Sequence, residues 1–273
     1  MRLKFLFFAS LFSLQGLSAS HESIDRYLKY LSSSPNFGRC GDHIKGEMQI
    51  VADRDLILQI EEKYYNEFIQ KGYSPLEAEK CSRVGVVEED AYWLWLRDPL
   101  ILPNGKTTAY NRFFAKKGLC CDVPGIAVMA VSKEKEILLN IIFRHATREW
   151  EMELPKGGRE KDETSEQAAL RELEEETGIK GENALKIASI ASESGVVSSI
   201  MDFLLVTDLS TSKINREDTE VIYGCVFKSK KAIKQALIDG FVELEMDGNK
   251  VKVFCRDPFL TSALFIAEAK GLL

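Results

Sequence analysis

The chain has 273 residues, of which 45% are hydrophobic and 29% are charged, so it can bury one large core or two smaller ones. Its formal net charge of −6 at pH 7 argues against a general nucleic-acid binder, and we expect no nucleic-acid partner.

The first segment has the pattern of a secretory signal peptide. Arg2 and Lys4 precede an apolar run over residues 5–14, and small residues follow at 18–20. The run is too short to cross a membrane, and the small residues are typical of a cleavage site. We therefore expect residues 1–20 to be removed on export, leaving a periplasmic or secreted protein with no stable membrane association. A buried N-terminal helix in a cytoplasmic protein is the alternative.

All six cysteines lie beyond this segment, at Cys40, Cys81, Cys120, Cys121, Cys225 and Cys255. An even number of cysteines in an exported chain permits disulfides, and Cys40 with Cys81 is the pair that we expect, since both lie in the N-terminal region. No cysteine or histidine spacing suggests a zinc site.

Residues 21–81 are predicted to form a helical extension. Residues 22–31 have an amphipathic pattern that ends at a Ser-Ser-Ser-Pro stretch, and residues 54–71 place apolar side chains on one side of a second helix.

The pattern changes over residues 82–120, which we interpret as a small antiparallel β-subdomain. Short β-rich runs occur at 84–87, 92–96, 100–102 and 107–114. We expect the chain to turn at Asp98–Pro99 and again at residues 103–106, where Pro-Asn-Gly-Lys is a good turn sequence.

Residues 121–273 have the pattern of the main domain. We expect strands 125–132 and 136–144 to pair across a turn, and residues 150–154 to lead into a glycine-containing loop. Further strands are expected at 185–192, 201–208 and 219–226, with helices at 229–239 and 258–272 and a hairpin within 242–255. Strands on both sides of one central helix predict an α/β (α+β) domain with a mixed sheet between helices.

That central helix follows the loop in LPKGGREKDETSEQAALRELEEETGI, residues 154–179. Pro155, Gly157 and Gly158 indicate a tight loop. Thr164 or Ser165 can cap the helix that follows, and Gly178 can end it in a left-handed conformation.

Three glutamates of this helix, Glu172, Glu175 and Glu176, are spaced i, i+3 and i+4 and therefore share one face. Neighbouring like charges repel, and an all-oxygen set of ligands suits Mg²⁺ or Mn²⁺ rather than zinc. Arg171, eight residues after Glu163, can bind that carboxylate with two hydrogen bonds and hold the loop on the helix.

The spacing from Gly157 through Glu163 to Arg171–Ile179 resembles the complete sequence box of the Nudix hydrolase superfamily. This resemblance implies an α/β/α sandwich with a mixed sheet, here preceded by the small antiparallel sheet and the helices. GIAVMAV, FRHA, WEMELPKGG and a late EDTE resemble the branch of ADP-ribose and ADP-sugar pyrophosphatases. The resemblance covers about Ser82 to the C-terminus.

The resemblance also implies roles for individual residues. The metal ligands would be the carbonyl of Lys156 with Glu172, Glu175 and Glu176. Glu163 and Arg171 would support these ligands at the catalytic site. Arg144 occupies the place of a substrate-binding arginine, with Gly157 and Gly158 as the substrate-facing loop; a plain surface arginine is the alternative.

One position departs from the family. Ser199 stands where the ADP-ribose enzymes usually have a further catalytic glutamate after the box. The general base therefore stays open among Glu172, Glu193, Glu217 and Glu220.

The implied activity is metal-dependent hydrolysis of a small nucleoside diphosphate derivative, ADP-ribose or an ADP-sugar, to AMP and a sugar phosphate. A dinucleoside polyphosphate or diphosphoinositol polyphosphate hydrolase is the first alternative, since LPKGG suits it equally. A non-catalytic nucleotide-binding module is the second, and the intact box argues against it. Assembly as a homodimer stays open.

Overall fold

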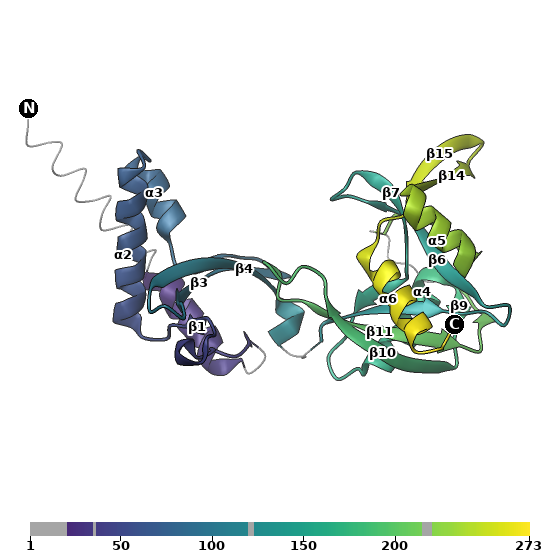
Figure 1. The fold of residues 1–273 in the computed structure, drawn as a ribbon, viewed down its shortest axis with the longest axis horizontal. Coiled ribbons are helices and arrows are strands. Elements are labelled where there is room, and N and C mark those ends of the chain that lie inside the picture. The colour runs from purple at the N-terminus through teal and green to yellow at the C-terminus, as the bar shows by residue number, and fades with distance from the viewer. Residues whose placement is uncertain (1–20, 35–36, 120–122, 215–219) are drawn as a thin grey trace, which may run out of the picture. The chain divides into compact units, whose positions relative to one another are not determined.

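The computed structural model describes residues 21–34, 37–119, 123–214 and 220–273, which belong to two compact units (Figure 1). The first unit comprises residues up to 122 together with 193–198, and the second comprises 123–192 and 199–273. The predicted signal peptide and Cys120–Cys121 lie outside the described residues. No described helix is both long enough and apolar enough to span a bilayer.

The first unit packs helices on an antiparallel sheet. Residues 21–33 are helical, and the elements that follow are η2 (His43–Lys45), β1 (Gln49–Ile50), α2 (Arg54–Gln70), α3 (Pro75–Ser82), β2 (Gly85–Glu89), β3 (Trp93–Ile101), β4 (Thr107–Ala115) and η3 (Lys116–Leu119). β4 pairs along the whole of β3 on one edge, and β2 and β1 share the other edge. Tyr27 of the first helix and Phe37 share a core with Leu94, Leu96 and Phe114 of the sheet. The helical segment and the small sheet, which the sequence analysis separates, therefore bury their apolar side chains against each other.

The turn expected at Asp98–Pro99 is wrong, because β3 runs through both residues. The Pro99 carbonyl accepts a 2.8 Å hydrogen bond from the Val51 amide. Pro99 has no N–H to donate at this same edge of β3. It lies between Arg97, where the pairing with β2 ends, and Leu100, where the pairing with β1 begins. Proline is tolerated there because no partner strand needs a donor at that point.

The expected disulfide is also wrong, since Cys40 and Cys81 are both free. The Cys40 carbonyl accepts a hydrogen bond from Ile50 of β1. The Cys81 carbonyl, near the end of α3, accepts one from Arg97. The two cysteines are thus held on different elements by separate backbone contacts.

The second unit contains two mixed sheets. The first has the order β10 (Asn183–Ala191), β11 (Ile200–Thr207), β5 (Gly125–Ala130) and β8 (Lys156–Gly158), and the second has the order β13 (Ile222–Ser229), β6 (Glu136–Arg144), β7 (Glu149–Glu153), β15 (Asn249–Phe254) and β14 (Phe241–Met246). β9 (Ile179–Lys180) pairs with β12 (Ser210–Thr211), and the helices are α4 (Ser165–Thr177), α5 (Lys230–Asp239) and α6 (Pro258–Ala269).

Two cores lie on opposite faces of β5, all six of whose residues are buried. Ile126, Val128 and Ala130 pack with Ala168, Ala169 and Leu173 of α4. Ala127 and Met129 pack on the other side with side chains of the second sheet, α5 and α6. The predicted sandwich of helices around mixed β-structure is confirmed, with two sheets where one was expected (Figure 1).

The expected pairing of β5 with β6 is wrong beyond the turn. A single bridge, Val131 to Ile137, joins the two segments at their connection. β5 then pairs with β11 on one edge and β8 on the other, whereas β6 pairs with β13 and β7. β6 is directed to the other sheet because both edges of β5 are already occupied.

Candidate active site

The box helix begins and ends where its sequence predicts. The Thr164 side chain accepts a hydrogen bond from the Gln167 amide, and the Gln167 side chain accepts one from the Thr164 amide, which together form a capping box. Gly178 ends the helix with a φ of 68°, the left-handed conformation that glycine adopts without strain. The helix is therefore fixed at both ends, with Glu172 between them.

Gly157 fixes the position of Glu172. The expected tight loop is wrong at residues 156–158, which form the short strand β8. β8 pairs with β5 through Gly157 and Ile126, so the backbone before the box helix is held by a strand ladder. A side-chain Cβ built on Gly157 would overlap the carboxylate of Glu172. Only glycine lets this carboxylate pack against the loop backbone.

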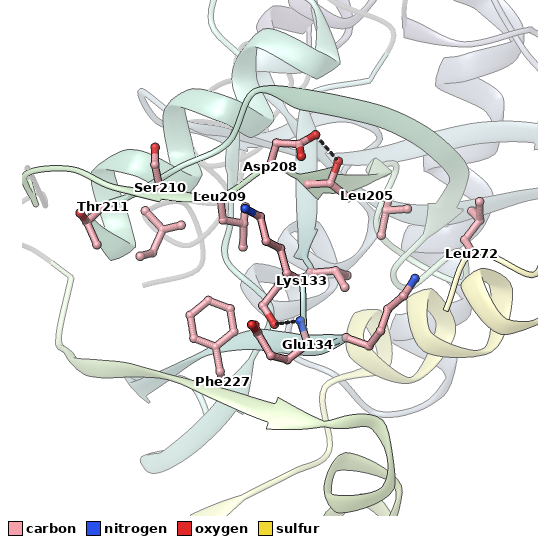
Figure 2. A pocket seen from close by; sticks show the side chains of 14 residues that line it. Lys133, Glu134, Leu205, Asp208, Leu209, Ser210, Thr211, Phe227 and Leu272 are labelled. Carbon is pink, nitrogen blue, oxygen red and sulfur yellow. Dashed lines mark hydrogen bonds between the residues drawn. The ribbon is translucent and has the colours of Figure 1, made fainter.

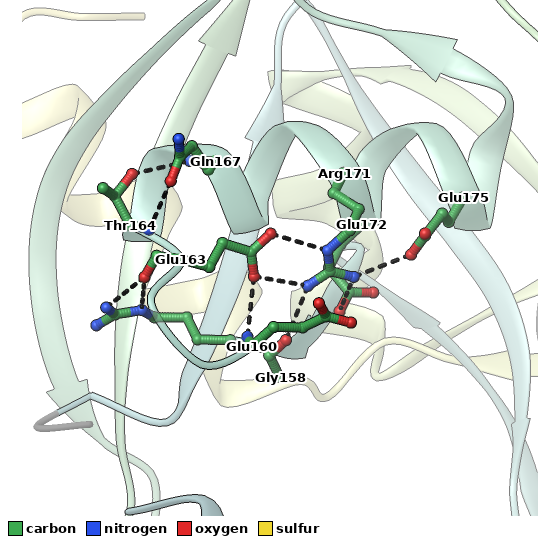
Figure 3. A network of polar contacts seen from close by, with 9 residues as sticks. Gly158, Glu160, Glu163, Thr164, Gln167, Arg171, Glu172 and Glu175 are labelled. Atoms are coloured by element: carbon green, nitrogen blue, oxygen red, sulfur yellow. Dashed lines mark hydrogen bonds and ion pairs between the residues drawn. The ribbon is translucent and has the colours of Figure 1, made fainter. Parts of the chain in front are cut away.

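Arg171 joins the loop to the helix and confirms the predicted bidentate contact with Glu163 (Figure 3). Its Nε and Nη2 donate to the two Glu163 oxygens at 2.9 and 3.0 Å. Nη2 also donates to the Gly158 carbonyl at 3.0 Å, and Nη1 donates to Glu172 at 3.0 Å and Glu175 at 2.9 Å. These five hydrogen bonds match the five N–H groups of a guanidinium. The two hydrogen bonds to Glu163 hold the pKa of that carboxyl below its ordinary value.

Glu176 points to the second sheet and is only 4% exposed. Its Oε2 accepts a 2.7 Å hydrogen bond from Asn140 of β6. Burial, together with the negative charges of Glu220 and Glu172, raises the pKa of Glu176 to about 8. Burial also raises the pKa of Glu172, against the lowering effect of Arg171. The charges of these acids therefore act on one another across the site.

The predicted metal ligands do not meet at coordination distances in this arrangement. Within the described part of the chain, no three histidine, cysteine, aspartate or glutamate side chains are grouped closely enough to hold one metal ion. Glu175 turns toward Arg171, and Glu176 turns toward Asn140.

The chemistry of the donors nevertheless fits a hard cation. Glu172 and Glu176 are carboxylates whose pKa values are raised by burial and by neighbouring negative charges, including that of Glu220, and the buried Oδ1 of Asn140 beside Glu176 has no hydrogen-bond partner. A cation would relieve both the repulsion and the unpaired oxygen.

Arg144 belongs to a second, partly buried charge network. Its Nε and Nη2 donate to one oxygen of Glu153 at 3.0 and 2.6 Å. Lys156 contacts the same oxygen at 2.8 Å and also Asp257 at 3.3 Å. Two cations thus face two buried carboxylates, and the pKa of Glu153 is lowered because Arg144 and Lys156 outweigh its burial. Arg144 is neither isolated nor fully on the surface, since its side chain is 39% exposed.

The candidates for the general base are spread over different parts of the chain. The charge of Glu220 raises the pKa of both Glu172 and Glu176, so Glu220 lies close enough to interact with both. Glu193 belongs to the first unit, in a segment whose Val196 carbonyl accepts a hydrogen bond from the Phe113 amide of β4. Glu217 lies outside the described residues.

Sequence reasoning missed Asn140, Glu153 and Asp257. Glu153 carried a usable signal, because it is the last acidic residue of EWEME, directly before the Leu-Pro-Lys-Gly-Gly stretch. Asn140 is a lone amide in the apolar strand ILLNIIF. Asp257 precedes Pro258 at the start of a helix, which indicates a cap and conceals the contact with Lys156.

A hollow of about 480 Å³ lies at the other end of β5, beyond Val131. Lys133, Glu134 and Phe227 are among the residues that line it (Figure 2). None of the residues that the sequence predicts for the site lines this hollow. The candidate active site is therefore the charged surface around Gly157 and α4.

We compared the chain with protein families, with curated proteins and with solved structures. Residues 123–237 match the family described as "NUDIX domain". This part of the chain is a Nudix domain.

The chain is similar to curated proteins of two kinds. It is 34% identical over 116 residues to the ADP-ribose pyrophosphatase of Bacillus subtilis (strain 168), covering 42% of this chain and 59% of that protein. It is 32% identical over 113 residues to the methanol dehydrogenase activator of Bacillus methanolicus, covering 41% of this chain and 57% of that protein. A mouse ADP-sugar pyrophosphatase is 35% identical over 109 residues, covering 38% of this chain and 50% of that protein. The chain thus spans less than two thirds of the length of each of these three relatives.

The fold is similar to that of a solved structure described as an ADP compounds hydrolase. The TM-score is 0.52 at 20% sequence identity, and the match covers 68% of this chain and 91% of that chain. At this identity the likeness supports the Nudix fold.

Proposed function

We propose that the protein is a metal-dependent pyrophosphohydrolase that cleaves ADP-ribose or an ADP-sugar to AMP and a sugar phosphate. The observation that carries this proposal is the complete assembly of the box: Gly157 receives the Glu172 carboxylate, and Arg171 ties that carboxylate to Glu163 and to the loop. A module that only bound nucleotides would have no need of this full set.

Glu172, Glu175, Glu176 and the carbonyl of Lys156 would hold Mg²⁺ or Mn²⁺. When bound, the cation would supply charge neutralisation at the diphosphate and a more acidic water. Gly157 and Arg171 keep Glu172 in place for this role, and Asn140 orients Glu176.

Glu220 is the residue that we assign as proton acceptor. Water attacks one phosphorus, the bond from that phosphorus to the bridging oxygen breaks, and the water proton passes to a carboxylate. Support comes from the electrostatic effect of Glu220 on Glu172 and Glu176, which requires that it lies near them. Arg144, fixed by Glu153, would bind an oxygen of the substrate phosphate.

The environment of Lys156 favours a diphosphate over a polyphosphate substrate. Its ammonium group contacts Glu153 and Asp257 and lies 5.1 Å from the centre of the Phe259 ring. The side chain is only 13% exposed, so this lysine is committed to internal carboxylates. A highly anionic ligand would need additional cations that face outward.

The test is a hydrolysis screen of ADP-ribose, ADP-glucose, diadenosine tetraphosphate and a diphosphoinositol phosphate, with Mg²⁺, with Mn²⁺ and with EDTA. We expect AMP and a sugar phosphate from the first two, only in the presence of metal. Glu176→Gln should lower kcat/KM by roughly 100-fold or more while the circular dichroism spectrum stays unchanged. Preference for a polyphosphate substrate, or activity of this variant above about a tenth of wild type, would contradict the proposal.

A further inference from the structure

We propose that Arg256 is a second substrate-binding arginine, which binds the phosphate of the diphosphate that Arg144 does not hold. This inference rests on the proposed function, because it concerns the substrate of the same site. Arg256 follows β15 and lies outside the Nudix box and outside residues 123–237.

Arg256 is held by a buried carboxylate. Its Nε and Nη2 donate to Glu151 Oε1 at 3.1 and 2.7 Å, and Nε also contacts Oε2 at 3.3 Å. The Glu151 side chain is 5% exposed, whereas that of Arg256 is 47% exposed. The Phe254 ring lies 4.2 Å from the guanidinium carbon. The guanidinium is therefore fixed by a carboxylate and packed on a ring while much of it faces solvent.

The pair formed by Arg256 and Glu151 repeats the pair formed by Arg144 and Glu153. Both carboxylates belong to β7, two residues apart, so they lie on the same face of the sheet about 7 Å from each other. In both pairs the arginine uses Nε and Nη2. Among the described residues, nothing hydrogen-bonds to Nη1 of either arginine.

Two guanidinium groups that are fixed by carboxylates on the same face of β7 suit a ligand with two neighbouring oxyanions. Each has N–H donors left for a phosphate, and each is already oriented, so less side-chain entropy is lost on binding. A diphosphate supplies two such oxyanions and AMP supplies one. The simpler alternative is that Arg256 only neutralises the buried Glu151.

The experiment compares wild type, Arg256→Gln and Lys252→Gln with Mg²⁺ present. Lys252 is the matched control: it is a cation of β15 that packs 4.8 Å from the same Phe254 ring, yet it makes no ion pair with Glu151. We measure KM and kcat for ADP-ribose and inhibition constants for ADP and AMP.

For Arg256→Gln we expect KM and the ADP inhibition constant to rise roughly tenfold, as for one lost charge-assisted hydrogen bond. In this variant the inhibition constant for AMP and the kcat for ADP-ribose should change less than about twofold. Lys252→Gln should have the same constants as wild type. Equal changes for ADP and AMP, or no change for either, would overturn the proposal.

The double variant Glu151→Gln/Arg256→Gln separates binding from folding, because it removes the buried charge together with its partner. If ADP binding recovers in this variant, Arg256 acts only through Glu151 and the proposal is wrong. If wild type hydrolyses neither ADP-ribose nor ADP-glucose, the proposed function fails by itself. Calorimetric titration with ADP and AMP then still tests Arg256.

Discussion

Glu176 lies in an environment that disfavours its charged form. Four glutamates lie between residues 172 and 176, and Arg171 contacts two of them, Glu172 and Glu175. Glu176 is buried and accepts a hydrogen bond from the neutral amide of Asn140. Burial of a carboxylate near other negative charges favours its protonated form. The proton and a metal ion therefore compete for the same oxygen atoms.

This competition predicts that the stabilisation of the protein by Mg²⁺ depends on pH. The pKa of Glu176 is raised from 4.5 to about 8 by burial and by Glu220 and Glu172, so folding takes up a proton between these values. For metal-free protein this contribution to stability is complete below about pH 4.5 and is lost as the pH rises through about 8. Addition of Mg²⁺ should then raise Tm more at pH 8.5 than at pH 6.

Thermal unfolding with EDTA and with saturating Mg²⁺ at both pH values checks this. Glu176→Gln is the control, and the difference between the two pH values should shrink in it. A larger Mg²⁺ effect at pH 6 than at pH 8.5 in wild type would mean that Glu176 is not the group that Mg²⁺ deprotonates.

Gly157 gives a second prediction at the scale of one residue. A methyl group at this position displaces Glu172, because the two would overlap. A displacement of about 1 Å at a reacting centre costs roughly 100-fold in rate, so Gly157→Ala should lose about that much in kcat/KM. Gly224→Ala is the matched control, since a Cβ there meets no atom within 4 Å. Equal activity of the two variants would show that the Glu172 position does not matter.

At the scale of elements, the ends of helices follow local sequence more closely than the paths of strands. Thr164 and Ser229 cap α4 and α5, and Gly178 and Gly240 end them in the left-handed conformation. A cap is a contact between residues two or three positions apart, so it needs no tertiary structure. α3, which was not predicted, obeys the same rule: Ser74 and Glu77 form a capping box, and Pro75 is the first helical residue.

The cap of α4 can be tested separately from the chemistry. Thr164→Ala removes the acceptor for the Gln167 amide and should lower the free energy of unfolding by about 1 kcal/mol. Activity at 25 °C should stay within about threefold of wild type, because fraying is confined to the first turn and Glu172 lies two turns further on. Denaturant unfolding measures the first quantity and steady-state kinetics the second. A loss of activity as large as that of Gly157→Ala would mean that the cap positions the acids.

At the scale of the whole molecule, the chain forms two units that the sequence does not separate cleanly. Residues 193–198 lie between β10 and β11 in sequence, yet they group with the first unit. The Phe113 amide donates to Val196 at 2.7 Å, and the Ser198 amide donates to Phe113 at 3.0 Å. This segment contains Glu193, so replacement of Glu193 also tests a part of the first unit.

Export is the prediction that concerns the whole molecule. Residues 1–20 have the charge, apolar run and small residues of a cleaved signal, and we propose that the mature protein begins near Ser20 or His21. N-terminal sequencing of natively produced protein from the extracytoplasmic fraction is the measurement. Recovery of an intact Met1 from the cytosol would contradict export.

The box was readable from the sequence because its contacts are local. Gly157, Glu163, Arg171 and Glu172 lie within sixteen consecutive residues, so one loop and one helix bring them together. The spacing of Glu163 and Arg171 predicted their ion pair, and the cap residues predicted the ends of α4. The hairpin expected within residues 242–255 is confirmed by the pairing of β14 with β15, which again joins neighbouring segments of the chain.

Contacts between distant elements were decided by the tertiary structure. Asn140 reaches Glu176, Asp257 reaches Lys156, and Arg256 reaches Glu151 across 36, 101 and 105 positions of sequence. Each partner depends on which strands become neighbours, and the separation of β6 from β5 shows that adjacent strands in sequence need not pair.

The two kinds of contact differ in predictability because they act over different separations in sequence. Helix caps and i, i+4 contacts are set by backbone geometry over a few residues. Strand neighbours and buried ion pairs depend on which apolar faces are covered and which sheet edges remain open, and those are properties of the folded chain as a whole.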